Sequence, residues 1–230
     1  FRPSGAAEIR KAAYEFDRMA KRINRHLNQR SEMLSGISHD LRTPLTRIKL
    51  QLAMIKDKNL SKKLSSDVDD MEKMLNEYLQ FASTGAKDKT ETFDISELIL
   101  KLINNYNNPN IIQNFKGEIY FNGRKNLIAR CINNLIENSL KYAKKVEISM
   151  EKQKDNLMIM VSDDGPGVPE KEHENIIKPF YKIDKSRSES KSSVGLGLSI
   201  ASDISRSHGG DIKFAKSKFG GLEVSISLPF

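Results

Sequence analysis

The chain has 230 residues, of which 38% are hydrophobic, and this excludes a disordered tail and allows one or two domains with a compact core. Its single cysteine, Cys131, excludes an internal disulfide scaffold and favours a reducing, cytoplasmic setting. The net charge of +8 is spread along the chain without a basic stripe, so no direct nucleic-acid contact is expected. No apolar run approaches the ~20 residues needed to cross a bilayer.

The first 82 residues predict two amphipathic helices, because apolar or small residues recur at alternating spacings of four and three. In the first helix these are Ile9, Ala13, Phe16, Ala20, Ile23, Leu27, Leu34, Ile37, Leu41, Leu45, Ile48, Leu52 and Ile55. A polar turn at residues 56–59 precedes the second stripe, which comprises Leu64, Val68, Met71, Leu75, Tyr78 and Ala82. Two stripes do not close a core, so a dimer of two helical hairpins is expected.

Polar residues interrupt the first helix at residues 38–45, SHDLRTPL. His39 lies off the apolar stripe and is expected to face solvent, with Thr43 on its face one turn later. Its neutral imidazole, with an ordinary pKa of about 6.5, is a free nucleophile at cytoplasmic pH. Pro44 lacks an amide donor and is expected to bend the helix. The alternative is that Thr43 bonds a carbonyl one turn back and that Asp40 is a solvated charge.

The helical period is lost at residues 84–90, which gain glycine and charge and predict a linker. Beyond it we expect helices from a cap at Asp94 or Ser96 to about Asn105, at 124–142 and at 196–207. Strands are expected at 118–121, 146–150, 157–162, 211–214 and 222–228. Runs of both kinds predict an α+β sandwich with helices on one face of a mixed sheet.

Three stretches of this second region could bind a nucleotide together. Asn134 and Asn138 share one helix face, with residues 141–142 (Lys-Tyr) a turn further on, and amide oxygens and lysine suit a hard cation and phosphate. Residues 163–167, Asp-Asp-Gly-Pro-Gly, follow a strand and offer a carboxylate beside backbone that can approach a planar ligand. Residues 194–198, Val-Gly-Leu-Gly-Leu, open a helix whose free amides suit phosphate oxygens.

Each stretch alone has an ordinary alternative: a solvated Asn pair, a common Asp-Gly turn, or a lone Gly-x-Gly. Their order along the chain favours the nucleotide site. In this order they resemble the nucleotide-binding domain of sensor histidine kinases, shared more distantly with gyrase, chaperone and mismatch-repair ATPases. Residues 131–142 resemble its N box, 163–167 its G1 box, 179–180 part of its F box and 195–198 its G2 box.

Two N-terminal segments carry the same resemblance. Residues 38–50, SHDLRTPLTRIKL, are similar to the phospho-acceptor box, most closely that of the EnvZ-type osmosensor branch. Residues 1–19 resemble the back half of a HAMP signalling domain. Because the chain begins with Phe1 and lacks a signal-peptide pattern, we expect it to be the cytoplasmic portion of a longer inner-membrane protein.

The resemblance implies roles for individual residues. His39 is the expected phosphoryl acceptor, Asp40 its general base, and Thr43 the residue that orients a water when phosphate is removed from the partner regulator. Asn138 is expected to hold Mg²⁺. The expected ATP contacts are Asn134, Asn138, Lys141, Tyr142, Asp163 on the adenine amino group, Gly165, Gly167, Lys182, Val194, Gly195, Leu196, Gly197 and Leu198.

The match departs from the family in three places. The usual Phe-x-Pro-Phe is Ile-Lys-Pro-Phe at residues 177–180, Val194 replaces a small or hydroxylated residue, and the lid at 186–193 lacks glycine. These departures concern the lid and its phosphate contacts.

The implied fold is an all-α helical hairpin forming a dimeric four-helix bundle, followed by an α+β two-layer sandwich of the histidine kinase/Hsp90-like ATPase type. The expected domains are the end of HAMP at 1–30, the dimerisation and phospho-acceptor domain at 31–86, a linker at 87–92 and the ATP-binding domain at 93–230.

The implied activity is ATP-dependent autophosphorylation of a homodimer, followed by transfer to an aspartate of an OmpR-like response regulator receiver domain, with a phosphatase activity on that regulator. Two alternatives stay open: an ATPase of the gyrase and chaperone type that does not phosphorylate histidine, and a dimeric signalling adaptor with a degenerate nucleotide domain.

Overall fold

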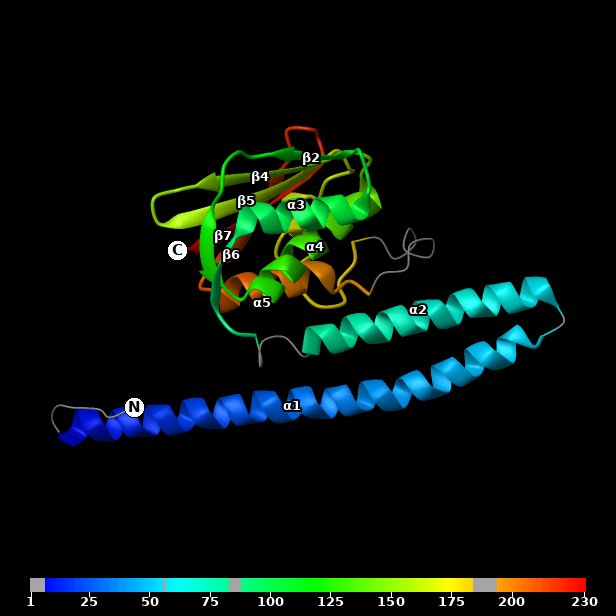
Figure 1. The fold of residues 1–230 in the computed structure, drawn as a ribbon, viewed down its shortest axis with the longest axis horizontal. Helices are drawn as coiled ribbons and strands as arrows, with labels where there is room; N and C mark the ends of the chain where they lie inside the picture. Colours follow the sequence, from blue (N-terminus) through cyan, green and yellow to red (C-terminus); the bar gives the residue numbers. More distant parts are fainter. Residues whose placement is uncertain (1–6, 56, 83–87, 184–193) are drawn as a thin grey trace. The chain divides into compact units, whose positions relative to one another are not determined.

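The computed structural model describes residues 7–55, 57–82, 88–183 and 194–230 of the chain. It divides into two compact units, Phe1–Ala86 and Lys87–Phe230, drawn in Figure 1. Each unit is built from its own set of elements.

The first unit is a hairpin of two helices, α1 (Ala7–Ala53) and α2 (Lys58–Ala82). The helix α1 is continuous across Pro44 and curves gently (Figure 1). The turn between the helices is fixed by Asp57, whose Oδ1 accepts the amides of Asn59 at 3.0 Å and Leu60 at 3.1 Å. A carboxylate in this position satisfies amides that lack partners at a helix start, so it sets where α2 begins.

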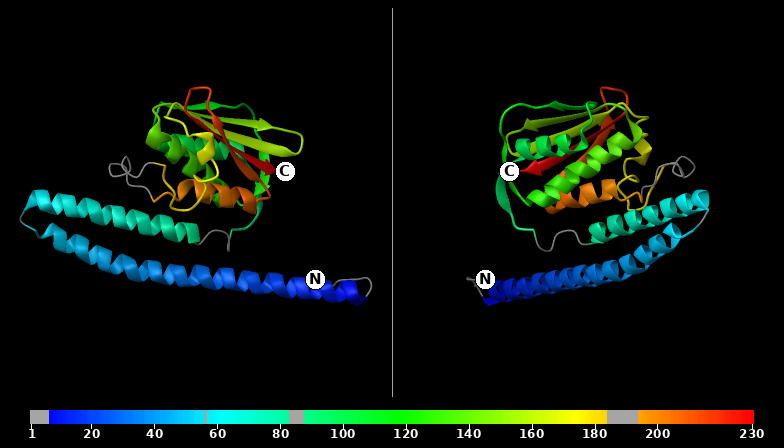
Figure 2. Two further views of the ribbon diagram at one scale, coloured as in Figure 1. Left: turned by 180° about the vertical axis from the view of Figure 1, so that it is seen from behind. Right: turned by 45° about the vertical axis from the view of Figure 1, so that its right-hand side comes forward.

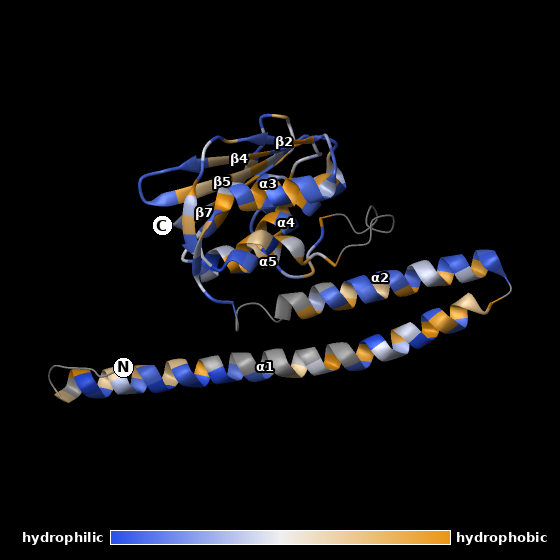
Figure 3. Cartoon of the chain, in the orientation of Figure 1, coloured by the Kyte–Doolittle hydropathy of each residue, from blue (hydrophilic) through white to orange (hydrophobic). Residues whose placement is uncertain are grey.

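Among its described residues, the hairpin has one small hydrophobic cluster of its own. Leu45, Leu52 and Val68 are buried, with Leu75 packed against them. Six further apolar residues of the two predicted stripes are 37–52% exposed: Ile37, Leu41, Ile48, Leu64, Met71 and Tyr78. Figure 3 shows both helices with apolar and polar residues intermixed. An apolar stripe left open in this way fits a second copy of the hairpin, as expected for a homodimer.

The second unit is a two-layer sandwich. Its five-stranded sheet has the order β2 (Ile111–Asn114), β4 (Val146–Lys152), β5 (Asn156–Asp163), β7 (Leu222–Pro229) and β6 (Asp211–Lys216). The pair β2 and β4 is parallel and the others are antiparallel. Helices α3 (Ile95–Tyr106), α4 (Lys125–Tyr142) and α5 (Gly197–Ser207) lie on one face of the sheet (Figure 2). The expected α+β sandwich with a mixed sheet is confirmed.

Two short strands were not predicted from the sequence in their observed form. The strand β1 (Glu91–Asp94) overlaps the predicted linker and pairs with β3 (Tyr120–Gly123), while β2 was not predicted at all. Phe93 of β1 meets Phe121 of β3 edge to face, with ring centroids 6.2 Å apart. This aromatic contact across the pair explains how so short a ribbon is held.

The strand β5 positions Asp163, the first of the candidate site residues on the sheet. Leu157, Ile159, Val161 and Asp163 alternate along it and are all buried, so they share one face. Asp163 therefore ends a row of apolar residues.

Among the described residues, no helix combines the length and apolarity required to cross a membrane.

Candidate nucleotide site and phospho-acceptor segment

The topology brings the end of α4 beside the end of β5. A short turn joins α4 to β4, and β4 pairs antiparallel with β5, so α4 and β5 run in the same direction. A Cβ at Gly165, just after β5, would lie 3.2 Å from the carbonyl oxygen of Tyr142 at the end of α4. Residues predicted from two separate motifs, Lys141 with Tyr142 and Asp163 with Gly165, therefore lie together.

The two neighbouring aspartates have different surroundings. Asp163 is 3% exposed, and its Oδ1 accepts the amides of Gly165 at 2.9 Å and Leu222 at 3.0 Å. Among the described residues none donates to its Oδ2. Asp164 is exposed, and its Oδ1 accepts the amides of Lys144 and Lys145, which lower the pKa of this carboxyl, that of Lys145 most. Asp163 is thus held with an oxygen free for a ligand donor, whereas Asp164 fixes the turn after α4.

Gly221 also belongs to this site, although sequence reasoning missed it. A Cβ at this position would lie 2.3 Å from Asp163 Oδ1 and 2.5 Å from the Gly165 amide nitrogen. Both distances are far below van der Waals contact, so only glycine lets the β6–β7 turn approach the carboxylate. The Gly220-Gly221 pair before the last strand is a visible turn signal, but nothing in the sequence connects it to Asp163.

The Asn face of α4 lies against the start of α5. Asn134, Asn138 and Lys141 are half-buried on one side of the helix. The Asn134 side chain donates through Nδ2 to the Arg130 carbonyl at 3.0 Å, and its Oδ1 lies 3.5 Å from where a Cβ on Gly197 would be. The structure therefore brings the N-box face together with the Gly-x-Gly helix start. Lys141 Nζ lies 5.1 Å from the centroid of the Tyr142 ring, which is half exposed.

The chain segments on either side of the predicted lid are joined. The Phe180 amide donates to the Gly195 carbonyl at 3.0 Å, and both residues have positive φ, 66° and 79°. A Cβ at Gly195 would lie 2.9 Å from the Tyr181 carbonyl oxygen, so glycine is required there. The Tyr181 hydroxyl donates to Glu172 at 2.6 Å, which lowers the pKa of Glu172 and raises that of Tyr181. The lid residues 186–193 lie outside the described residues.

The remaining predicted contacts differ in how they could meet a ligand. Gly167 has φ of 70° in the turn after Asp163. Lys182, Val194 and Leu198 are half-buried, whereas Leu196 is 1% exposed. The Leu196 side chain belongs to the core, so only its backbone is available to a ligand.

The phospho-acceptor segment lies within α1. Asp40 and Thr43 are exposed on this helix. The His39 side chain lies outside the described part of the chain, so its exposure stays a prediction. Further along the helix, the Thr46 hydroxyl donates to the Arg42 carbonyl at 3.0 Å, and whether Thr43 bonds a carbonyl one turn back stays a prediction.

The residues present fit Mg²⁺ in one specific way. The described residues contain no group of three His, Cys, Asp or Glu side chains that could hold a metal ion. Mg²⁺ keeps several waters and takes most of its remaining ligands from substrate phosphates, so one amide oxygen is a sufficient protein ligand. Asn138, half-buried beside Asn134, offers that oxygen.

Comparison with known families assigns both units. Residues 29–87 match the His Kinase A (phospho-acceptor) domain. Residues 123–230 match the histidine kinase-, DNA gyrase B- and HSP90-like ATPase family. The second match contains all of the nucleotide-site residues described above.

Curated relatives match almost the whole chain. The sensor histidine kinase GtrS of Pseudomonas aeruginosa is 35% identical over 227 residues, which are 98% of this chain and 47% of the relative. The sensor histidine kinase CpxA of Escherichia coli is 30% identical over an alignment of 240 positions, which covers 98% of this chain and 52% of the relative. The chain thus spans about half the length of these relatives.

Solved structures share the fold. Full-length ShkA in complex with AMPPNP superposes with a TM-score of 0.72 at 21% identity, covering 87% of this chain and 46% of that one. The histidine kinase AdeS of Acinetobacter baumannii gives a TM-score of 0.58 at 19% identity, covering 83% and 97%. These solved structures show the fold, and the two domain matches with the relatives above show that the chain belongs to the sensor histidine kinases and carries their phospho-acceptor domain followed by their ATPase domain.

Proposed function

We propose that this chain is the catalytic portion of a sensor histidine kinase that binds ATP with Mg²⁺, phosphorylates itself on His39 and passes the phosphoryl group to an aspartate of a response regulator. The observation that carries the proposal is the Asp163 arrangement. Two backbone amides fix Oδ1, and no described donor occupies Oδ2. A buried carboxylate held in this way is suited to accept a hydrogen bond from an amino group such as that of adenine.

The other candidate site residues would contact the Mg²⁺ ion and the phosphates of the nucleotide. Asn138 would hold Mg²⁺ and Asn134 would support it, while Lys141 and Lys182 would meet the phosphates. When bound, Mg²⁺ supplies neutralisation of the phosphate charge. The amides at the start of α5, residues 195–198, would donate to phosphate oxygens, since a helix start leaves amides without partners.

The transfer itself needs a nucleophile and a base. One imidazole nitrogen of His39 attacks the γ-phosphorus as the bond to the β–γ bridging oxygen breaks and ADP leaves. The proton on the other nitrogen passes to Asp40, as the family resemblance implies. The phosphorylated imidazole then donates its phosphoryl group to the regulator's aspartate.

Thr43 would serve the reverse task of removing phosphate from the regulator by orienting a water. We expect Thr43→Ala to keep autophosphorylation and to lose regulator dephosphorylation by about tenfold or more, because only the water's positioning depends on the hydroxyl. Release of phosphate from a phosphorylated receiver domain measures this. Equal rates in the variant and the parent protein would assign Thr43 a structural role only.

The finer organisation is also a proposal. It comprises the end of a HAMP domain at 1–30, the dimerisation domain at 31–86, a linker at 87–92, an ATP-binding domain at 93–230, and a full-length inner-membrane protein of the EnvZ-type osmosensor branch with an OmpR-like partner. Its support is the sequence resemblance of residues 1–19 and 38–50. The open apolar stripe of the hairpin supports the homodimer.

Incubation with ATP labelled at the γ-phosphate tests the activity. We expect an acid-labile, base-stable label on the protein that is absent from His39→Ala. Release of free phosphate without a labelled protein would instead favour an ATPase that does not phosphorylate histidine. If saturating Mg-ATP failed to raise the melting temperature, the adaptor alternative would be favoured.

A further inference from the structure

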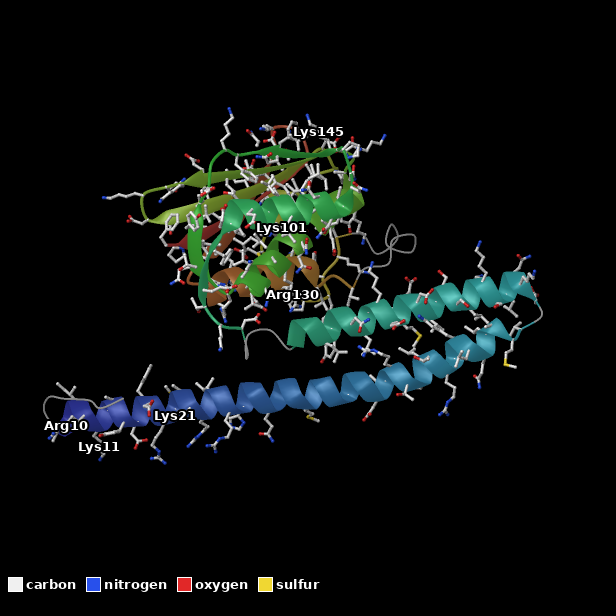
Figure 4. The ribbon with its side chains drawn as sticks, in the orientation of Figure 1. Arg10, Lys11, Lys21, Lys101, Arg130 and Lys145 are labelled. Atoms are coloured by element: carbon white, nitrogen blue, oxygen red, sulfur yellow. The ribbon has the colours of Figure 1, made fainter. Side chains whose placement is uncertain are left out.

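Arg130 extends the functional face of α4 by one turn. It lies on α4, as labelled in Figure 4, four residues before Asn134, and it is half-buried like Asn134, Asn138 and Lys141. Spacings of four, four and three place these four residues in one row along the helix. No motif match assigns Arg130 a role.

Two of the three guanidinium nitrogens of Arg130 are buried without a partner. Its Nε and Nη2 are buried and have no hydrogen-bond partner. Burial lowers the pKa of the guanidinium, and no carboxylate of the described residues pairs with it. Arg124, at the start of the same helix, is by contrast bonded to the Ser207 carbonyl at 2.8 Å and hydroxyl at 2.6 Å.

This arrangement costs folding free energy. Each buried donor without an acceptor has lost its hydration without gaining a hydrogen bond, and the loss is larger when the donor is charged. An apolar side chain of similar volume would fill the same space at lower cost. An anion supplied by a ligand is the partner that would offset this cost.

The position of Arg130 selects which anion. The base-binding Asp163 lies beside Tyr142, at the C-terminal end of α4. From there the row runs back through Asn138 and Asn134, and Arg130 lies about 12 Å beyond Asn138 along the helix axis, given 1.5 Å per residue. A nucleotide whose base is at Asp163 and whose phosphates follow this row brings its terminal phosphate nearest to Arg130.

We propose that Arg130 binds the terminal phosphate of ATP and makes the site favour ATP over ADP. The planar guanidinium presents two parallel N–H groups that match two phosphoryl oxygens. The inference rests on the proposed nucleotide site and adds to it a residue that recognises the γ-phosphate.

Calorimetric titration of the full chain with Mg-ATP and, separately, with Mg-ADP tests the proposal. We expect Arg130→Gln to weaken ATP binding about 10- to 100-fold, the loss of a charged hydrogen bond, and to leave ADP binding within twofold. Arg130→Lys, which keeps the charge but not the fork, should show an intermediate loss for ATP. Lys101→Gln is the matched control, because Lys101 is exposed on α3 (Figure 4) and pairs only with Glu97 among the described residues.

A stability measurement separates ligand binding from a structural role. Without nucleotide, Arg130→Met should raise the thermal midpoint, because it removes the unpaired buried charge. A lowered midpoint, or equal losses of ATP and ADP affinity in Arg130→Gln, would overturn the inference, as would unchanged ATP binding. A parent chain that bound neither nucleotide would overturn the proposed function itself, whereas one that bound both with no Arg130 dependence would overturn the inference alone.

Discussion

At the scale of single residues, the two adjacent aspartates at the end of β5 differ in exposure and in the backbone amides that their carboxylates accept. Asp163 is buried, and its Oδ1 is held by the amides of Gly165 and Leu222. Asp164 is exposed and holds the amides of Lys144 and Lys145. One residue therefore presents an oxygen to the site, and the other fixes the turn that brings α4 to it.

The variants Asp163→Asn and Asp164→Asn test these different roles of the two aspartates. Asp163→Asn should weaken Mg-ATP binding about 100-fold, because an amide can place a donor where the adenine amino group needs an acceptor. Asp164→Asn should leave the affinity within a few-fold and lower the denaturation midpoint. Calorimetry and urea denaturation of both variants measure the two effects, and a larger affinity loss in Asp164→Asn would reverse the assignment.

Most of the candidate residues that the structure brings together around Asp163 were named from the sequence, but their contacts were not. The family resemblance selected Asp163 over Asp164, which periodicity alone does not separate. Gly221 was missed because its need for glycine arises from a contact with Asp163, 58 residues earlier in the chain. The buried Leu196 side chain also could not be predicted, because a Gly-Leu-Gly-Leu pattern does not reveal which leucine enters the core.

At the scale of elements, the contact between the start of α4 and the end of α5 depends on a histidine. The Nδ1 of His208, just after α5, lies 2.8 Å from the Ile204 carbonyl, so it donates there and leaves Nε2 as an acceptor. That Nε2 accepts from the backbone amide of Arg124 at 3.2 Å and from its side-chain Nε at 3.4 Å. Burial, and to a lesser degree the Arg124 charge, lower the pKa of His208.

This contact between α4 and α5 should make the free energy of unfolding depend on pH. Because the pKa of His208 is lower when folded than its unfolded value of about 6.5, the unfolded chain binds the proton more readily. The contribution is fully present above pH 6.5 and is lost as pH falls toward the folded pKa. Urea denaturation at pH 7.5 and 5.5 should show a smaller difference in His208→Gln than in the parent protein.

His173→Gln is the control for that measurement, since it removes another histidine of the same unit. It should keep the pH dependence of the parent protein. If the His208 and His173 variants behaved alike, the acceptor role of His208 would be contradicted.

Elements with several turns or long apolar runs were predicted closely, whereas the shortest strands were not. The helix expected at 124–142 is observed at Lys125–Tyr142, with Arg124 at its N-cap position. The strands β1 and β2 have four residues each, and their existence depends on pairing with distant strands. Such pairing leaves little trace in local sequence.

At the scale of the whole molecule, the open apolar stripe of the hairpin predicts a dimer. Ile48 lies on the stripe and is 39% exposed, whereas Leu50 lies off it and is 65% exposed. Ile48→Asp should shift the chain toward monomer, because it places a charge in the expected interface. Leu50→Asp should leave the dimer intact because it stays in solvent. Sedimentation equilibrium distinguishes the two, and equal effects would exclude this stripe as the interface.

The two-unit organisation was the feature most accessible from sequence, because the hydrophobic period changes between the units. The helical hairpin repeats every three to four residues, whereas the second unit mixes helices with alternating strands. The match to the phospho-acceptor domain at 29–87 and to the ATPase family at 123–230 agrees with that change. The parallel β2–β4 pair that completes the sheet was not visible, since it joins segments separated by α4.

The central claim is that ATP bound beside Asp163 phosphorylates His39, and locating the phosphoryl group tests it most directly. The chain has four histidines, His26, His39, His173 and His208. After incubation with Mg-ATP, peptide mapping by mass spectrometry at neutral to basic pH should place the phosphoryl group on His39 alone, and Asp163→Asn should abolish it. A phosphoryl group on any other histidine, or full phosphorylation in Asp163→Asn, would contradict the account.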